Sequence, residues 1–148
     1  MLPRALPAAL AIAFLAVAWT ASPPANPQKA AAAVCVRFAD TNFDAAGDDN
    51  QSANLNGEWV RIKNVCATRK AIGGWAIHDY NKIHTYRFPA GLYIGPGKTI
   101  TLHSGRGTNT SAKRYWGRSY GAVWNNSAPE FAYLKNGAGT LISRMTEY

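Results

Sequence analysis

The sequence EWVRIKNV, residues Glu58–Val65, decides the fold class. Apolar and polar side chains alternate along it, and successive side chains of a β-strand point to opposite faces of a sheet. Val60 and Ile62 therefore share one face, and Arg61 and Lys63 share the other. This alternation predicts a strand that is buried on one side and exposed on the other, as in an antiparallel sheet.

Further short runs of this kind follow along the chain, and no apolar repeat at helical spacing is long enough to predict a helix. The other expected strands are Val34–Phe38, Gly74–Asp79, Thr85–Phe88, Thr99–His103, Phe131–Leu134 and Thr140–Met145. Pro96-Gly97 favours a type II turn, and residues 136–139 (NGAG) favour a hairpin turn. Residues 40–54 and 105–123 are expected to be long loops. About seven short strands broken by turn residues predict an all-β sandwich or barrel.

The beginning of the chain differs in composition from the rest. Residues 8–19 are an unbroken apolar run preceded by Arg4, which is typical of an export signal and too short to span a bilayer comfortably. We expect a signal peptide over residues 1–21, an Ala/Pro-rich linker over residues 22–33 and one domain over residues 34–148. The protein is therefore expected to be secreted. An uncleaved membrane tether is the alternative, and no other integral membrane segment is expected.

The chain has two cysteines, Cys35 and Cys66. An even number of cysteines in an exported chain favours a disulfide, and two separate thiols are the alternative. The closed loop would hold about 30 residues and would add about 3 kcal/mol of stability. No C-x-x-C pair or Cys/His cluster is present, so the sequence predicts no metal site of the zinc type.

Several short motifs follow one another along the expected domain. They are Leu55-Asn56-x-Glu58-x-Val60-x-Ile62-x-Asn64, Gly74-Trp75, Phe88 with Ile94-x-Pro96-Gly97, His103-Ser104-Gly105-Arg106-Gly107-Thr108-Asn109, Tyr115-Trp116-Gly117 and Val123-Trp124-Asn125-Asn126. In this order they resemble the lamin-tail domain (LTD) family, and in particular its exported bacterial members. The resemblance covers residues 34–148, with one departure, because Pro129-Glu130 stands where the family usually has Gly-Asp.

This resemblance implies an immunoglobulin-like antiparallel β-sandwich of about seven strands. It also implies an interaction role without catalysis, since the domain contacts chromatin and partner proteins in nuclear lamins. Bacterial relatives are exported, alone or beside hydrolase domains. Because a fold does not settle a function, the candidate sites are weighed on their own residues.

Asn56 and Glu58 are the candidate structural polar residues. Glu58 has the parity of Val60 and Ile62, so we expect it to be partly buried, and a buried carboxylate needs hydrogen-bond partners. We favour backbone N–H groups of a neighbouring loop as those partners; a general acid or an ion ligand is the alternative. No second acid pairs with Glu58 by spacing, and no G-x-S-x-G nucleophile motif is present. The sequence therefore predicts no catalytic residue, no enzyme activity and no cofactor.

Two further groups of side chains are candidates for a metal site. The acidic loop contains Asp40, Asp44, Asp48, Asp49 and Asn50. Its spacing does not match an EF-hand, so a solvated loop is favoured over a calcium site. The histidines are His78, His84 and His103, of which His78 and His103 are expected to point outward on different strands. The sequence predicts no metal ligand among them.

Cations and aromatic rings interleave within the second long loop. They are Lys113, Arg114, Tyr115, Trp116, Arg118, Tyr120 and Trp124. Such a surface stacks on sugars or bases and pairs with anions, and the outward Arg61 and Lys63 would extend it. The candidate binding residues are therefore Arg61, Lys63, Lys113, Arg114, Trp116 and Arg118. The alternative is that the tryptophans cover the core and the cations are only solvated.

The formal net charge of +8 suits an anionic partner, or serves solubility alone. We expect a non-catalytic exported module that contacts an anionic polymer, a glycan or a protein of the cell envelope. A nucleic-acid-binding module that acts through a basic surface is the first alternative, and an accessory domain of an extracellular hydrolase is the second. The sequence does not indicate an oligomeric state.

Overall fold

The computed structural model describes residues 34–48, 54–124 and 129–147. The signal peptide predicted over residues 1–21 and the linker predicted over residues 22–33 lie outside the described residues. Both stay predictions. Within the described part of the chain, no helix is long and apolar enough to cross a membrane.

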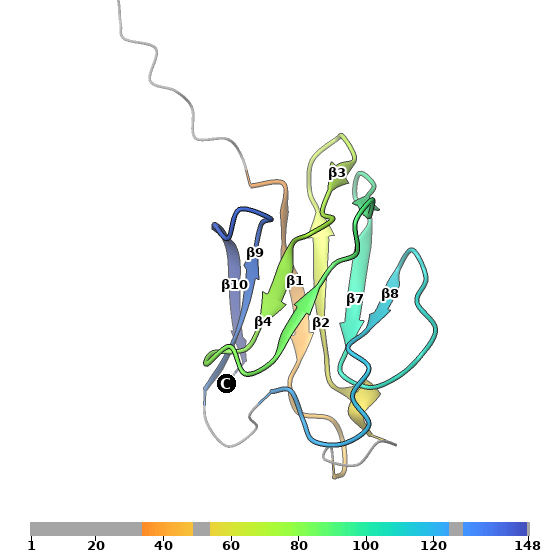
Figure 1. The fold of residues 1–148 in the computed structure, drawn as a ribbon, viewed down its shortest axis with the longest axis vertical. Coiled ribbons are helices and arrows are strands. Elements are labelled where there is room, and N and C mark those ends of the chain that lie inside the picture. The colour runs from red at the N-terminus through yellow and green to blue at the C-terminus, as the bar shows by residue number, and fades with distance from the viewer. Residues whose placement is uncertain (1–33, 49–53, 125–128, 148) are drawn as a thin grey trace, which may run out of the picture. The chain divides into compact units, whose positions relative to one another are not determined.

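Two four-stranded sheets make up most of the domain, and in Figure 1 the second sheet lies across the first. The first has the order β1-β2-β7-β8, with strands Val36–Asn42, Trp59–Asn64, Thr99–His103 and Lys113–Tyr115. The second has the order β10-β9-β4-β5, with strands Leu141–Glu147, Glu130–Lys135, Ala76–His78 and Thr85–Arg87. A small third sheet pairs β3, Lys70–Ala71, with β6, Tyr93–Ile94, and a 3-10 turn, η1, spans Leu55–Gly57.

The core lies between the inner faces of the two large sheets. Val60 and Ile62 of β2 are buried, as the alternation predicted. From the second sheet, Ile77 and Leu134 pair with each other across β4 and β9, and both are fully buried. Burying a side chain of this size contributes about 1.5–3 kcal/mol, so these inward positions supply much of the driving force that holds the sheets together.

This arrangement confirms the predicted all-β sandwich. Among the described strands, no ladder joins the two large sheets, so the chain forms a sandwich and not a barrel. Every run in which alternation predicted a strand contains one. However, β1 continues to Asn42, which extends it into the stretch 40–54 that was expected to be a loop.

The main difference from the sequence analysis is that three short strands, β3, β6 and β8, were not predicted. Strand β8 lies inside the expected loop 105–123 and pairs with β7 in parallel, whereas all other ladders are antiparallel. Two or three residues are too few to show a period of two. Strand β8 is instead held by main-chain bonds at the edge of β7, such as the one from the Thr101 N–H to the Ala112 carbonyl oxygen (2.9 Å).

The predicted disulfide and turns are present. Cys35 and Cys66 are bonded, with their Cα atoms 5.1 Å apart, so the residue before β1 is tied to a residue just after β2. Gly97 has a φ of +68°, the left-handed conformation that a type II turn requires at its second central position. Asn136 begins the hairpin turn between β9 and β10, where its side-chain oxygen accepts the Thr140 N–H.

Candidate functional site

Three of the predicted binding residues meet on the outward face of the first sheet. Arg61 pairs with Thr101, and Lys63 pairs with Thr99. Lys113 of β8 pairs with the same Thr101 from the other side. Because neighbouring strands are about 4.8 Å apart, Arg61 and Lys113 begin about 10 Å apart across β7. The register therefore builds a row of cations across adjacent strands.

Arg37 extends this row onto β1, where it pairs with Lys63. Arg37 was not among the predicted binding residues, although it alternates with the buried Val36 and Phe38 and could have been assigned to the outward face. We define the basic sheet face as Arg37, Arg61, Lys63 and Lys113, together with the rings of Trp59 and Tyr115.

Contacts on the basic sheet face hold Arg61 in place. Its guanidinium pairs with the Asp40 carboxylate (3.2 Å), and its Nε donates to the Thr101 hydroxyl oxygen (3.2 Å). The same guanidinium lies over the Trp59 ring, 4.6 Å from its centroid. The ion pair is well exposed to solvent, so it contributes at most about 1 kcal/mol. These contacts orient Arg61 and neutralise part of its charge.

The remaining cations of the basic sheet face are not neutralised. Arg37, Lys63 and Lys113 are exposed, and they form no ion pair within the described residues. Three of the eight acidic side chains, Glu58, Asp79 and Glu130, are meanwhile buried. The surface is therefore more positive than the net charge of the sequence indicates.

The two rings of the basic sheet face, those of Trp59 and Tyr115, are already in contact with other groups of the protein. Tyr115 stacks on His103 with ring centroids 5.3 Å apart. Gly107 lies so close to the same ring that a Cβ there would come within 2.3 Å of it. Trp59 carries the guanidinium of Arg61. These contacts limit how far the rings are free to stack on a sugar or a base.

The structure separates the other three predicted binding residues from the basic sheet face. Arg114 pairs with the buried Leu102, so it points inward, and its Nε is buried with no hydrogen-bond partner among the described residues. Trp116 packs against the core, with its ring 5.8 Å from that of Trp124. Arg118 donates to the carbonyl oxygens of Gly121 (2.7 Å) and Tyr120 (3.1 Å). These residues organise the loop that follows β8.

Arg114 also lies close to a half-buried tyrosine, Tyr86. Burial raises the pKa of Tyr86 above its ordinary value of 10.0, and the Arg114 charge partly opposes the shift. The Tyr86 ring contacts Phe88 and Trp116. Tyr86 is therefore a packing residue whose hydroxyl keeps its proton at neutral pH.

Glu58 is fully buried beside the start of β2. Its carboxylate accepts the backbone N–H groups of Val123 (3.0 Å) and Trp124 (3.1 Å). Asn56 acts similarly at the surface, where its side-chain amide donates to the Arg106 carbonyl oxygen (2.8 Å). Both residues thus attach distant loops to this end of the sandwich.

The described residues contain no group of three or more His, Cys, Asp or Glu side chains that is arranged to hold a metal ion. In the acidic loop, Asp40 pairs with Arg61, and Asp49 and Asn50 lie outside the described residues. His84 pairs with Asp79 (2.9 Å), whereas His103 donates from its Nδ1 to the Asn56 carbonyl oxygen (2.8 Å). His78 does lie on the outer face of the second sheet, opposite to the core residue Ile77, but its side chain is buried there.

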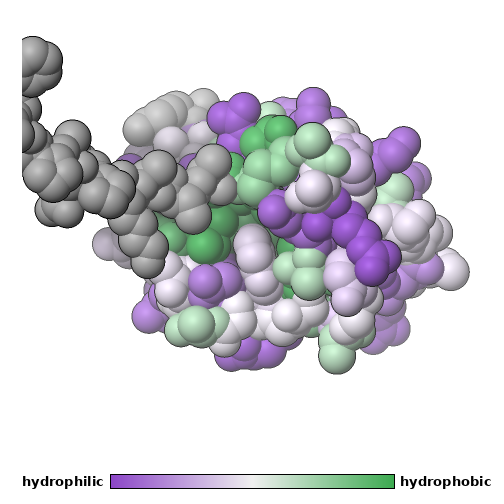
Figure 2. All heavy atoms as spheres, turned by 90° about the horizontal axis from the view of Figure 1, so that it is seen from above, coloured by the Kyte–Doolittle hydropathy of each residue, from purple (hydrophilic) through white to green (hydrophobic). Residues whose placement is uncertain are grey.

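The hydrophilic surface is not confined to one side of the molecule. Seen from the end that carries β3, hydrophilic residues are distributed around the rim of the domain, with hydrophobic ones between them (Figure 2). The basic sheet face is thus distinguished by the close spacing of its cations in register, and not by being the only hydrophilic region.

Comparison with known proteins identifies the fold family. The model of the family described as Lamin Tail Domain matches residues 29–148 and so includes all the strands from β1 to β10. No curated protein matches the chain.

Proposed function

Because the chain belongs to the lamin tail domain family, we propose that it works as a non-catalytic binding module whose ligand is an anionic polymer of the cell envelope. The family is one of binding and structural immunoglobulin-like domains. The ligand and its place of binding are the parts of the proposal that rest on this chain's own residues.

The observation that carries the proposal is the row of cations on the basic sheet face. Arg37, Lys63 and Lys113 are exposed and form no ion pair within the part of the chain that the structure describes. Strands hold their side chains in a fixed register, so successive cations recur at the strand spacing. Such a row matches a polymer whose negative charges also repeat.

A neutral glycan fits this face less well than a polyanion does. Aromatic rings on which a sugar can stack are a common part of glycan-binding sites. Here the Tyr115 ring is in contact with His103 and Gly107, and the Trp59 ring carries the Arg61 guanidinium. The unpaired cations of the basic sheet face are available to a ligand, whereas its rings are already in contact with other protein groups. Because bases also bind by stacking on rings, this limits base stacking by a nucleic acid as well.

The disulfide between Cys35 and Cys66 supports an extracellular location, because such bonds persist in oxidising compartments. The partners available there include acidic wall polymers. We therefore place the ligand at the cell envelope.

The test measures binding of the purified protein to an acidic wall polymer, to DNA and to a neutral glycan, each across a series of salt concentrations. The expected result is binding to the wall polymer that weakens steeply with salt, because counterions are released from the polyanion. A stronger affinity for the wall polymer than for DNA supports the envelope assignment. Equal affinities would mean recognition by charge alone, and binding of the neutral glycan only would refute the proposal.

Matched variants locate the site. The double variant Lys63→Gln with Lys113→Gln removes two cations of the basic sheet face, and Lys70→Gln with Lys82→Gln makes the same charge change elsewhere. Each lost contact lowers the slope of log affinity against log salt by about 0.7–0.9. We expect the first double variant to lose close to two such contacts and the second to lose none. Equal losses in both would contradict the assignment to this face.

A further inference from the structure

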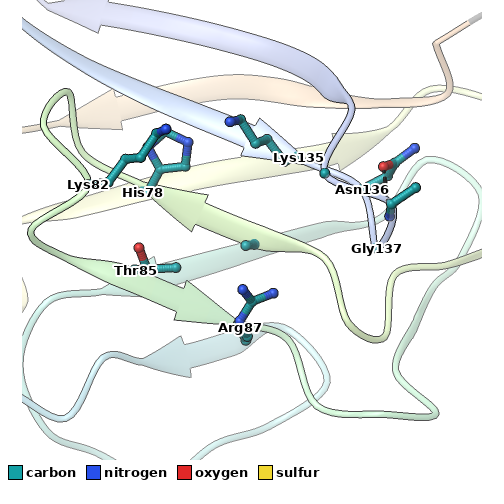
Figure 3. Close-up of a pocket in the computed structure, with 10 residues that line it drawn as sticks. His78, Lys82, Thr85, Arg87, Lys135, Asn136 and Gly137 are labelled. Carbon is teal, nitrogen blue, oxygen red and sulfur yellow. Dashed lines mark hydrogen bonds between the residues drawn. The ribbon is translucent and has the colours of Figure 1, made fainter.

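A cavity of about 400 Å³ lies on the second sheet, on the outer side of the domain (Figure 3). Its walls come from β4 and from the two strands that flank it, β5 and β9. The turn of residues 136–139 closes one side. This cavity is separate from the basic sheet face, which belongs to the other sheet.

The polar lining of the cavity is cationic. Lys82, Arg87 and Lys135 all contribute to it, and among the described residues that line it none is acidic. Arg87 and Lys135 both pair with Ala76 of β4, one from each side, so a small side chain stands between two long cationic ones. Three positive charges around one cavity repel one another unless an anion is present.

His78 lines the same cavity and is 95% buried, with a relative exposure of 5%. Its ring stacks on Tyr133, with centroids 5.1 Å apart. Its Nδ1 lies 2.7 Å from the Asp79 carbonyl oxygen, which only accepts hydrogen bonds, so Nδ1 carries a hydrogen. In the view of Figure 3 the His78 ring lies between the side chains of Lys82 and Lys135.

The other ring nitrogen of His78, Nε2, is buried and has no hydrogen-bond partner among the described residues. Leaving a buried polar atom unpaired is unfavourable. The nearest acid in sequence, Asp79, does not relieve it, because its carboxylate binds the His84 ring and the His84 N–H. The cavity thus combines an unsatisfied nitrogen with three cations.

We propose that this cavity binds a phosphate group, as the free ion or as a monoester. The three cations balance the charge of the phosphate, and a phosphate oxygen that displaces the atoms covering Nε2 shares one proton with it. The proton comes either from the ring, which then is an imidazolium, or from a singly protonated phosphate. Both forms satisfy Nε2, and the Nδ1 bond to Asp79 is kept in both.

A comparison of phosphate with sulfate distinguishes binding through a shared proton from binding by charge attraction alone. A sulfate ion carries no proton near neutral pH, so it binds only if the ring supplies one. Because Nδ1 already donates to the Asp79 carbonyl oxygen, Nε2 is the acceptor nitrogen of the ring, and a protonated phosphate offers it a donor that sulfate lacks. The cavity should therefore prefer phosphate to sulfate.

The test is a titration of the protein, labelled with ¹⁵N, with inorganic phosphate at constant ionic strength. The ring nitrogens of His78 are followed by NMR. We expect a saturable change at Nε2 while the signal of the Nδ1 hydrogen persists, and a weaker response to sulfate. A parallel titration with glycerol 3-phosphate shows whether the site takes a monoester or the free ion. No saturable change with either, or equal affinity for sulfate, would overturn the proposal.

Three variants distinguish a loss of phosphate binding from a loss of folding. Lys135→Gln changes a partly exposed side chain and should weaken phosphate binding roughly tenfold, the effect of one charge-assisted hydrogen bond. His78→Gln removes the ring itself and should abolish the preference over sulfate, provided that its thermal unfolding is cooperative. Lys70→Gln, the matched charge change at β3, should leave the phosphate affinity unchanged. An unaltered affinity in Lys135→Gln would refute the site.

Discussion

Replacing Glu58 by alanine should be among the most destabilising single changes at a polar position of this protein. The carboxylate accepts the N–H groups of Val123 and Trp124, and both of these residues are buried. The alanine variant leaves both N–H groups without this acceptor, at about 1–3 kcal/mol each. We therefore expect the free energy of unfolding to fall by about 3–5 kcal/mol.

Glu58→Gln should lie between the wild type and the alanine variant. The amide oxygen of Gln accepts one of the two N–H groups, but its amide nitrogen is a donor and cannot accept the second. The expected loss is about 2 kcal/mol, from one unpaired N–H group and the weaker bond to a neutral acceptor. Asp40→Asn is the matched control, because the exposed pair with Arg61 contributes less than about 1 kcal/mol.

Urea unfolding followed by tryptophan fluorescence measures these differences, since Trp124 is buried in the segment that Glu58 holds. Hydrogen exchange at the Val123 and Trp124 amides gives a local measurement. Both amides should exchange faster in Glu58→Ala relative to amides of β2. A loss of stability below about 1 kcal/mol in Glu58→Ala would refute the reasoning, because two buried donors cannot lose an acceptor at so small a cost.

Two further predictions concern the disulfide and alkaline pH. The double variant Cys35→Ser with Cys66→Ser should lose about 3–4 kcal/mol in urea unfolding, the loop-closure effect of a sequence separation of 31; an unchanged stability would contradict it. Burial raises the pKa of Tyr86, so the folded protein keeps the phenolic proton to higher pH than the unfolded chain. Stability should therefore fall as pH rises above 10.0, and Tyr86→Phe should remove part of that fall between about pH 9 and pH 11; an identical pH dependence in both proteins would rule this out.

The net charge does not show that several acidic side chains are buried while many cations are at the surface. Glu58, Asp79 and Glu130 are buried and accept hydrogen bonds, for example from the backbone N–H of Tyr80 to Glu130 (3.0 Å). Because these acids face inward, they do not neutralise the cations on the outer faces of the two sheets, where Asp40 is paired with Arg61. Cations therefore line both the basic sheet face and the cavity on the second sheet.

Much of the fold could be predicted because strand alternation is a local signal. Val60, Ile62 and their neighbours revealed the inner face of β2 directly, and β7 followed in the same way. Strand β8 could not be predicted, since three residues show no period and its pairing with β7 is made by the main chain. The same limit hid β3 and β6, which have two residues each.

The candidate site could be predicted only in part. Arg61 and Lys63 were assigned to an outward face from their parity, and the structure places Lys113 beside them because β8 pairs with β7. Lys113 and Arg114 were predicted to belong to one surface because they are adjacent in sequence, and this prediction was wrong. Adjacent residues of a strand point to opposite faces, so Arg114 is turned toward Tyr86 and the core.

The sequence by itself determined the fold class, the inward and outward faces of the longer strands, the turn at Gly97 and the two cysteines available for a disulfide. Each of these depends on residues close together along the chain or on residue type alone. Only the tertiary structure decided which cations become neighbours, where the Glu58 carboxylate finds its two donors, and that His78 is enclosed with an unpaired nitrogen. Those outcomes depend on the order in which strands pair, and pairing brings together residues that are far apart in the sequence.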